Sequence, residues 1–405
     1  MLIKLAISSL LSRKATVLLT IFTIAISTAI VLSVETIRHQ AKDSFTQTLS
    51  GTDLIIGARS GPINLMLYSV FRIGNATANM SWESYEAINQ HSNVQWSIPI
   101  SLGDSHRGYR VIGTNQQYFE HYQFANDQFL RFSEGGRFEQ VLDVVLGAEV
   151  AKRLGYTLGD KVVLSHGIGR ASFIQHTEHP FTVVGILAQT GTPVDKSLHV
   201  SLAGIEAIHL RPGVDAADEE ALVPNSITAV LVGLNSRLST FKVQRQINQY
   251  KAEALMAVLP GVALAELWQS MGLIERVLLL IAILVLVASL LGMMTMLLAT
   301  LQQRQREIAV LRAIGAPART IFSLIQLEVF AMTLMGVILG IVLLMLGLML
   351  AQPVLGAYMG LSLSISPFSL KVLLYIVGII ALAFVMACIP AALAYRLSLA
   401  KRLSS

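Results

Sequence analysis

Four long apolar runs dominate the pattern of hydrophobic and polar positions, and the segments between them carry nearly all of the charge. One run, Val277 to Leu301, has no charged residue in 25 positions. At about 1.5 Å per residue, a helix of that length spans about 37 Å, enough to cross a bilayer core of about 30 Å. The pattern therefore predicts four membrane-spanning helices, over 15–34, 277–301, 330–350 and 372–393.

The segment Glu35 to Met271 has a different pattern, in which short apolar stretches alternate with turn residues. Such alternation is typical of strands, and a few stretches have helical periodicity instead. The segment predicts a mixed α+β domain of roughly 190 residues, long enough to bury a core. We expect strands over 53–57, 94–101, 108–112, 141–146, 161–164, 181–187, 198–201 and 227–234, and helices over 80–90, 149–154 and 239–259.

Helical patterns also extend from the spans into this outer domain. Glu35 to Leu49 continues the first span as a polar helix, and the chain from Leu264 onward enters the second span as one helix. These two stretches are expected to form stalks that transmit motion between the domain and the membrane. Further along, Pro353 is expected to close the third span, and Pro390 to kink the fourth.

The patterns divide the chain into seven segments. They are an N-terminal amphipathic helix with the first span, an outer domain with stalk helices, the second span, a short basic turn, the third span, a short outer loop, and the fourth span with a tail. Their bounds are 1–34, 35–271, 272–301, 302–320, 321–351, 352–370 and 371–405.

Composition supports a membrane protein. The chain is 54% hydrophobic and 14% charged, whereas soluble domains carry about 25% charged residues. Charge is unevenly distributed: residues 35–271 hold 18 Lys and Arg against 22 Asp and Glu, a net charge of −4, and the remainder has a net charge of +9. The outer domain therefore has no basic stripe that could follow phosphates, which argues against nucleic-acid binding.

The distribution of Lys and Arg also predicts the orientation. The N-terminal segment, the turn at 302–320 and the C-terminal tail are all basic, and short basic segments are retained in the cytoplasm. We therefore expect a multi-pass protein of the inner (cytoplasmic) membrane with both termini cytoplasmic and the large domain in the periplasm. A cleaved signal peptide is the competing interpretation of 15–34, but the run exceeds a usual signal core of about 7–15 residues.

Candidate catalytic chemistry is sparse. Cys388 is the one cysteine, so no intrachain disulfide can form. The chain contains no phosphate-binding Gly-x-x-x-x-Gly-Lys-Ser/Thr, no His-Glu-x-x-His and no Gly-x-Ser-x-Gly. We expect a protein that is not an enzyme and binds no cofactor itself. If ATP drives it, ATP and Mg²⁺ bind on a partner chain.

The nine histidines all lie in the outer segment, and three of them, His166, His176 and His179, cluster in sequence. The His176-Thr-Glu-His179 spacing can serve a metal ion. No second ligand pair follows at a fixed spacing, so a solvated loop between two strands is the favoured interpretation. We expect no metal site, with these three histidines as weak candidates.

The basic turn between the second and third spans is the most informative stretch. Arg304, Arg306, Arg312 and Arg319 against Glu307 give it a net charge of +3. Its apolar spacing predicts a short amphipathic helix ended by a glycine, with a proline just before the next helix. Such a helix at the cytoplasmic surface offers a docking point for another protein, although charge alone is equally typical of an ordinary cytoplasmic loop.

Two features of the third span leave alternatives open. Glu328 lies near its entrance, where an ionisable group marks either a functional site or an interfacial side chain that reaches the headgroups. Gly336 and Gly340 form a Gly-x-x-x-Gly pair, which permits close approach of another helix. That helix could belong to a second copy or to the same chain.

The stretch 306–328, REIAVLRAIGAPARTIFSLIQLE, closely resembles the signature of the FtsX-like permease family, the membrane subunits of MacB-type ABC transporters. The resemblance extends to 53–71, to 191–208, to the N-terminal segment and to the end of the fourth span, and the order of one span, a large domain and three spans is kept. In that family the basic turn resembles the coupling helix that docks on the ATPase. Six residues fall on the family motif and are expected to couple to the ATPase: Arg306, Glu307, Leu311, Arg312, Gly315 and Ala316. Arg304 and Arg319 of the same basic turn complete the set of predicted coupling residues, and Glu328 corresponds to the acidic residue at the membrane entrance.

The resemblance implies a homodimeric or paired permease that binds two copies of a separate ABC ATPase subunit and works by mechanotransmission (type VII). Relatives resemble exporters, lipoprotein extractors, regulators of cell-wall hydrolases and components of metal (zinc) homeostasis, so the cargo and any periplasmic or lipoprotein partner stay open. A membrane-anchored periplasmic sensor or scaffold is the alternative. A transporter driven by an ion gradient would need paired charges or broken helices at mid-membrane, and the spans show neither.

Overall fold

The structure, a computed structural model, describes residues 2–166, 179–209, 222–303, 310, 313, 315–359 and 369–400. The chain forms two compact units. The helical unit comprises Met1–Gln40, Met271–Val354 and Leu363–Ser405, and the mixed unit comprises Ala41–Ser270 and Leu355–Ser362.

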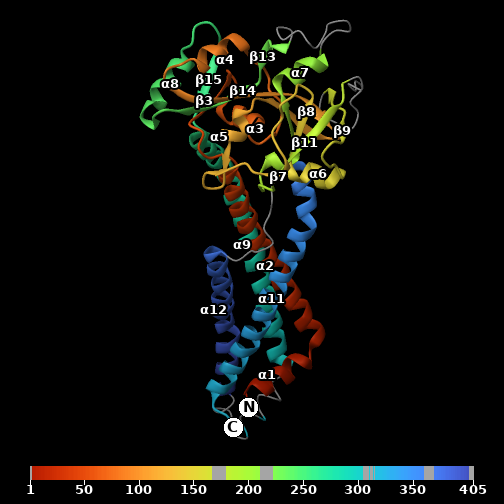
Figure 1. Cartoon of the computed structure of the whole chain (residues 1–405). Helices are drawn as coiled ribbons and strands as arrows, with labels where there is room; N and C mark the ends of the chain where they lie inside the picture. Colours follow the sequence, from red (N-terminus) through yellow and green to blue (C-terminus); the bar gives the residue numbers. More distant parts are fainter. Residues whose placement is uncertain are drawn as a thin grey trace. The chain divides into compact units, whose positions relative to one another are not determined.

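Long helices build the helical unit (Figure 1). After the short helix α1, four helices of the described chain are long and apolar enough to cross a membrane, which confirms the predicted spans. The bounds of the five helices are α1 Leu2–Leu11, α2 Lys14–Thr48, α9 Pro260–Gln303, α11 Ala318–Met359 and α12 Leu370–Ala400.

Close contacts between α2 and its neighbours define the packing of this unit. A Cβ at Gly336 would lie 2.7 Å from Ile24 Cγ2, and one at Gly340 would lie 2.8 Å from the carbonyl oxygen of Ala25. The Gly-x-x-x-Gly pair of α11 therefore packs against α2 of the same chain. Between α2 and α9, the hydroxyls of Ser27 and Ser289 are hydrogen-bonded to each other.

One large sheet organises the mixed unit. Eleven strands of the described chain belong to it, in the order β15-β1-β14-β3-β4-β12-β8-β11-β7, with β10 on β3 and β9 on β11. The strands are β1 Leu54–Ala58, β3 Val94–His106, β4 Tyr109–Thr114, β7 Phe132–Gly135, β8 Asp143–Leu146, β9 Lys161–Val162, β10 Ser165–His166, β11 Phe181–Leu187, β12 Ser197–Ser201, β14 Ala229–Leu234 and β15 Leu255–Val258.

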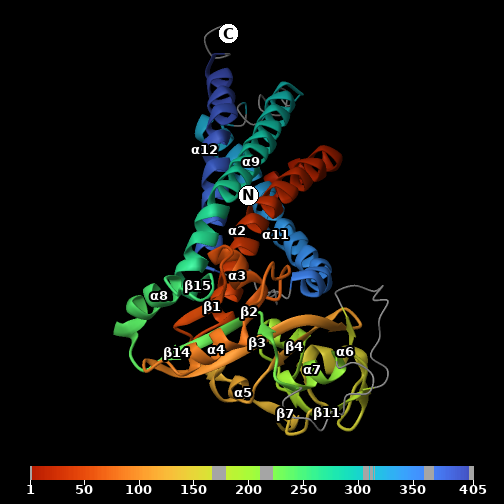
Figure 2. The ribbon, with the colours of Figure 1, turned by 90° about the horizontal axis from the view of Figure 1, so that it is seen from above.

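The long strand β3 joins two halves of this sheet. Its residues 94–100 pair with β14, and its later residues pair with β4. Figure 2 shows β1, β14 and β15 in one half and β4 and β11 in the other. Two-stranded pairs accompany the sheet: β2 Met80–Ser81 with β13 Ser226–Ile227, and β5 Gln123–Phe124 with β6 Gln128–Phe129.

Both faces of the sheet are covered, so its strands contribute to cores on both sides. In β14, Leu231 belongs to the cluster around α3 and α5, whereas Val230 and Val232 belong to the cluster under α4 and α8. In β8, Val145 belongs to the cluster around α3 and α5, and Val144 belongs to a third cluster beside α6 and α7. The covering helices are α3 Pro62–Ser69, α4 Trp82–Asn89, α5 Gln117–His121, α6 Ala148–Leu154, α7 Leu202–His209 and α8 Thr240–Asn248.

The sequence predictions for this unit are largely confirmed. The strand over 181–187 has the predicted bounds, and those near 54, 94, 143, 198 and 229 differ only at their ends. The helix α4 begins after Ser81, whose side chain accepts a hydrogen bond from the backbone N–H of Ser84, as its cap position requires. The sequence therefore predicts the α+β class of the domain correctly.

The predicted helix over 239–259 is wrong in its second half. The helix α8 ends at Asn248, and Leu255–Val258 forms the edge strand β15, antiparallel to β1. The side-chain oxygen of Asn248 accepts a hydrogen bond of 2.7 Å from the backbone N–H of Ala257, which holds the returning strand against the helix end. Tertiary pairing overrides the local periodicity here, because a four-residue strand has too little pattern of its own.

The apolar stretch 63–70, for which the sequence predicted no element, forms helix α3, with Pro62 at its first turn, a position where proline costs no hydrogen bond. One further expectation needs correction. The third span does not close at Pro353, because α11 continues to Met359. A proline removes one backbone hydrogen bond and can bend a helix without ending it.

Candidate coupling site and the helix junctions of the membrane unit

The basic turn lies mostly outside the described residues. Arg304, Arg306, Glu307, Leu311 and Arg312 all lie there, so their role in ATPase coupling stays a prediction. The described part of the turn is its exit into α11.

Gly315 has φ of +94°, a left-handed conformation that glycine adopts without strain. Ala316 and Pro317 follow, and the carbonyl of Pro317 accepts a hydrogen bond of 2.9 Å from the backbone N–H of Thr320 in the first turn of α11. Gly315 thus lies in the short turn that leads into α11.

Three helix ends meet beside this exit. Leu301 at the end of α9, Ile321 and Ile325 at the start of α11, and Ala391 and Ala394 near the end of α12 form one buried cluster. We call this junction the basic end of the helical unit.

Two cavities open at the basic end. One, of about 450 Å³, lies between α11 and α12 and is lined by Arg319, Phe322, Ser323, Ala392 and Tyr395. The structure thus places Arg319, a predicted coupling residue, at a recess formed by two helices.

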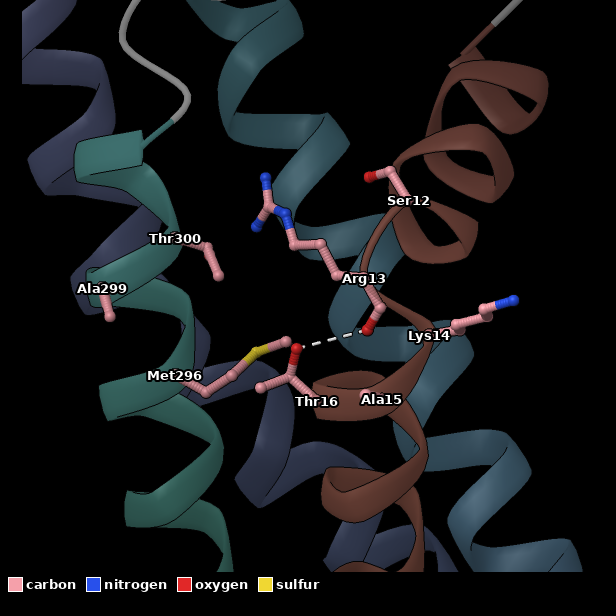
Figure 3. Close-up of a pocket in the computed structure, with 8 residues that line it drawn as sticks. All are labelled: Ser12, Arg13, Lys14, Ala15, Thr16, Met296, Ala299 and Thr300. Carbon is pink, nitrogen blue, oxygen red and sulfur yellow. Dashed lines mark hydrogen bonds between the residues drawn. The ribbon is translucent and has the colours of Figure 1, made fainter.

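The second cavity, of about 430 Å³, lies where the elbow between α1 and α2 faces α9 (Figure 3). Its lining comprises Ser12, Arg13, Lys14, Ala15, Thr16, Met296, Ala299 and Thr300. Sequence reasoning did not identify it, because the elbow and the end of α9 are far apart in the chain.

Glu328 is buried, with 4% of its surface exposed. Its side chain therefore lies inside the helical unit. A side chain that reached out to the lipid headgroups would be exposed instead. The neighbouring Gln326 is also buried, and its side-chain amide donates to the sulfur of Cys388 at 3.3 Å. Polar contacts between α11 and α12 thus accompany Glu328 at this depth.

An ionic cluster ties three helices together at the other end of the helical unit. Arg38 on α2 lies 3.4 Å from a carboxylate oxygen of Glu35 and 3.5 Å from one of Glu275 on α9. Lys371 on α12 lies 3.9 Å from Glu35, whose side chain is 4% exposed. We call these four residues the ionic clasp. Only the i,i+3 spacing of Glu35 and Arg38 could have indicated it from the sequence.

Within the mixed unit, the last turns of α2 and the first turns of α9 are anchored in the core. The ring of Phe45 lies 4.3 Å from that of Phe71 and 5.7 Å from that of Trp268, between centroids. The hydroxyl of Tyr122 donates a hydrogen bond of 2.8 Å to the carbonyl of Thr48. Both helices are therefore held by side chains of the domain that they enter.

A buried polar group lies beside these anchors and was also missed by sequence reasoning. His199 on β12 is fully buried, with its ring 4.9 Å from that of Tyr118. Burial lowers the pKa of His199 to about 3, with a smaller effect of the same sign from Arg72, and burial raises the pKa of Tyr118 to about 12. The histidine is therefore neutral at physiological pH and serves packing.

Of the weak metal candidates, His176 and the side chain of His166 lie outside the described residues, whereas His179 is described. Among the described residues, no group of three or more His, Cys, Asp or Glu side chains is placed to hold a metal ion.

Two family models match the chain. The model of the MacB-like periplasmic core domain matches residues 17–250, more than half of the chain, and that of the FtsX-like permease C-terminal region matches residues 279–399. Comparison with curated proteins finds no match.

Among solved structures, the periplasmic region of MacB from Actinobacillus actinomycetemcomitans matches with 12% identity and a TM-score of 0.35, over 56% of this chain and 94% of that chain. The extracellular domain of the noncanonic ABC-type transporter YknZ from Gram-positive bacteria matches with 13% identity and a TM-score of 0.32, over 51% of this chain and 99% of that one. With four membrane spans and a MacB-like periplasmic core domain, the chain belongs to the FtsX-like permeases and is the permease of a MacB/FtsX-type ABC transporter.

Proposed function

We propose that this permease couples ATP hydrolysis by a separate ATPase subunit to motions of its periplasmic domain. Two ATPase copies would bind ATP and Mg²⁺ and act on a homodimer or a paired permease in the inner membrane. The transported or extracted molecule would be an exported compound, a lipoprotein or another component of the envelope.

The continuity of α2 and α9 is the observation that carries this proposal. They have 35 and 44 residues, which corresponds to lengths of about 52 and 66 Å at 1.5 Å per residue. A bilayer core needs only about 30 Å, so both helices extend well beyond it. A continuous helix transmits displacement along its axis better than a flexible linker does, because its backbone hydrogen bonds resist bending.

The anchors at the far ends of these helices support the same function. Phe45 of α2 and Trp268 of α9 lie in ring contact inside the mixed unit, so a relative movement of the two helices would act directly on its core. In the helical unit, Arg38 and Glu275 link the same two helices. The helices α2 and α9 would therefore move together.

The basic turn would be the part of the permease on which the ATPase docks. It connects α9 directly with α11, and its Lys and Arg excess favours a cytoplasmic location, where an ATPase would dock. Both termini would then be cytoplasmic and the MacB-like domain periplasmic. We assign ATPase coupling to the turn as a whole, with Arg306 and Glu307 as the central contacts.

Charge reversal at Glu307 tests this assignment. We expect Glu307→Lys to abolish the effect of the permease on ATPase activity while expression and the elution profile stay unchanged. Glu83→Lys makes the same charge change in the first turn of α4 and should leave coupling intact. Normal stimulation of the ATPase by the Glu307 variant would contradict the assignment.

A further inference from the structure

The cavity at the α1–α2 elbow lies at the level of the lipid headgroups, on the evidence of both helices that form it. Ala15, in its wall, is the first residue of the apolar run of α2, and Thr300 lies one residue before the end of the apolar run of α9. A run of 20–25 apolar residues matches the hydrocarbon thickness, so its end marks the headgroup boundary. Ile7 and Leu11 of α1 are exposed apolar residues, which suits a helix lying at that boundary.

The lining combines a cation with hydroxyl oxygens and an apolar wall. Figure 3 shows the Arg13 side chain reaching between the elbow and α9, whereas the Lys14 side chain points away from α9. Met296 and Ala299 supply the apolar side. An arginine at this depth is suited to a phosphate, because its guanidinium donates several hydrogen bonds in a fixed plane.

The hydroxyls in this wall are arranged as acceptors. Ser12 donates to the carbonyl of Ser9 at 2.8 Å, Thr16 to that of Arg13 at 3.2 Å, and Thr300 to that of Leu297 at 2.8 Å. Each hydroxyl proton is thus directed to a backbone carbonyl, and the oxygen lone pairs remain for a donor. A headgroup that carries its own hydroxyls would supply such donors.

We propose that this cavity binds an anionic phospholipid of the cytoplasmic leaflet, such as phosphatidylglycerol. The Arg13 guanidinium donates to the lipid phosphate, the headgroup hydroxyls donate to the side-chain oxygens, and an acyl chain passes Met296 and Ala299. The volume of about 430 Å³ lies in the range of about 300–1,000 Å³ that is typical of ligand sites and accommodates a headgroup with the first part of its chains. The assignment to the cytoplasmic leaflet rests on the membrane topology in the proposed function.

Charge selects this lipid over a zwitterionic one. Outside the segment 35–271 the chain has a net charge of +9, and Arg13 places one positive charge inside the cavity. A phosphatidylcholine headgroup would bring a quaternary ammonium close to this charge and has no hydroxyl to donate. A bound anionic lipid would connect the elbow with the end of α9, immediately before the basic turn.

Native mass spectrometry of the full chain, with phosphatidylglycerol or phosphatidylcholine added in detergent, tests the proposal. We expect the wild type to retain one tightly bound phosphatidylglycerol per chain and to show no such preference for phosphatidylcholine. Arg13→Gln should weaken retention about tenfold or more, since it removes the charge-assisted contact. Lys14→Gln, an equal charge change at the adjacent residue, should retain the lipid.

Ala299→Trp provides a second variant that leaves every charge in place. Ala299 is exposed, so a larger side chain fills the cavity without disturbing the helix core. It should also reduce retention. Equal retention by the wild type, Arg13→Gln and Ala299→Trp would overturn the proposal, as would equal losses for Arg13→Gln and Lys14→Gln.

The same preparations separate lipid binding from protein docking. Unchanged lipid retention in Arg13→Gln together with loss of a co-purifying ATPase would assign the cavity to that protein and overturn the lipid proposal. The lipid measurement itself needs no ATPase. If the proposed coupling function failed, the lipid measurement would still be valid, and the two failures could be told apart.

Discussion

At the scale of single residues, the buried His199 makes the stability of the periplasmic domain depend on pH. Its pKa in the fold is about 3, against 6.5 as the ordinary value, so the folded chain stays neutral where the unfolded chain binds a proton. Protonation of this histidine does not oppose folding above pH 6.5. Below that pH, the unfolded chain binds a proton that the folded chain does not, so stability is lost progressively as the pH falls toward 3. We expect about 2 kcal/mol less stability from this group at pH 5 than at pH 7.5.

Replacement of His199 by Phe should flatten this pH dependence. Phenylalanine fits among the rings of Tyr118 and Phe119 and does not titrate. Thermal unfolding of the full chain at both pH values measures the difference in Tm for the wild type and the variant. The same slope in both proteins would show that another group titrates.

The Gly-x-x-x-Gly pair offers a residue-scale test of the membrane packing. Gly340→Leu would place side-chain atoms against Ala25 and Thr28 of α2, and overpacking of this kind costs about 1–3 kcal/mol. An added Cβ at Gly347 on the same helix meets no atom within 4 Å, so Gly347→Leu is the matched control. We expect a lower Tm only for the first variant. A dimer that dissociates in Gly340→Leu without loss of Tm would instead place this face between two copies.

At the scale of elements, the ionic clasp couples α2, α9 and α12. Among the described residues, Arg38→Gln leaves the buried carboxylate of Glu35 with the more distant Lys371 as its cationic partner. We expect a loss of about 1–2 kcal/mol, since Arg38 is itself partly exposed. The double variant with Glu35→Gln should recover part of that loss. Lys42→Gln, at an exposed position of the same helix, controls for charge.

A double-mutant cycle on Tm measures this coupling. Additive effects of the two substitutions would mean that Arg38 and Glu35 act independently and that the clasp does not hold the helices together.

Sequence patterns predicted long elements more accurately than short ones. The four spans were predicted from uncharged runs of 20 or more residues, because no soluble element needs such a run. The seven-residue strand β11 was predicted at its bounds, whereas the four-residue β15 was not, since its stability comes from pairing with β1.

Contacts between distant segments could not be predicted in this way. Arg38 meets Glu275, and His199 meets Tyr118, only because helix packing and sheet order bring them together. The cavity at Arg13 likewise needs both the elbow and the end of α9. The coupling residues, by contrast, were predicted from one continuous stretch of sequence. A gapless run of mixed residue types at 306–328 carries the family resemblance.

At the scale of the whole molecule, the permease is one of two kinds of subunit that the proposed transporter needs. The permease carries the spans, the two long helices and the periplasmic domain, and the energy of ATP would enter through another chain. Such a division requires a stable complex with a nucleotide-binding subunit.

Purification of the tagged protein from its own host in a gentle detergent, with identification of the co-purifying chains and an ATPase assay, tests this requirement most directly. We expect a stoichiometric P-loop subunit with vanadate-sensitive ATP hydrolysis. A protein that purifies without any nucleotide-binding partner and without ATPase activity would contradict the account and favour a membrane-anchored sensor or scaffold.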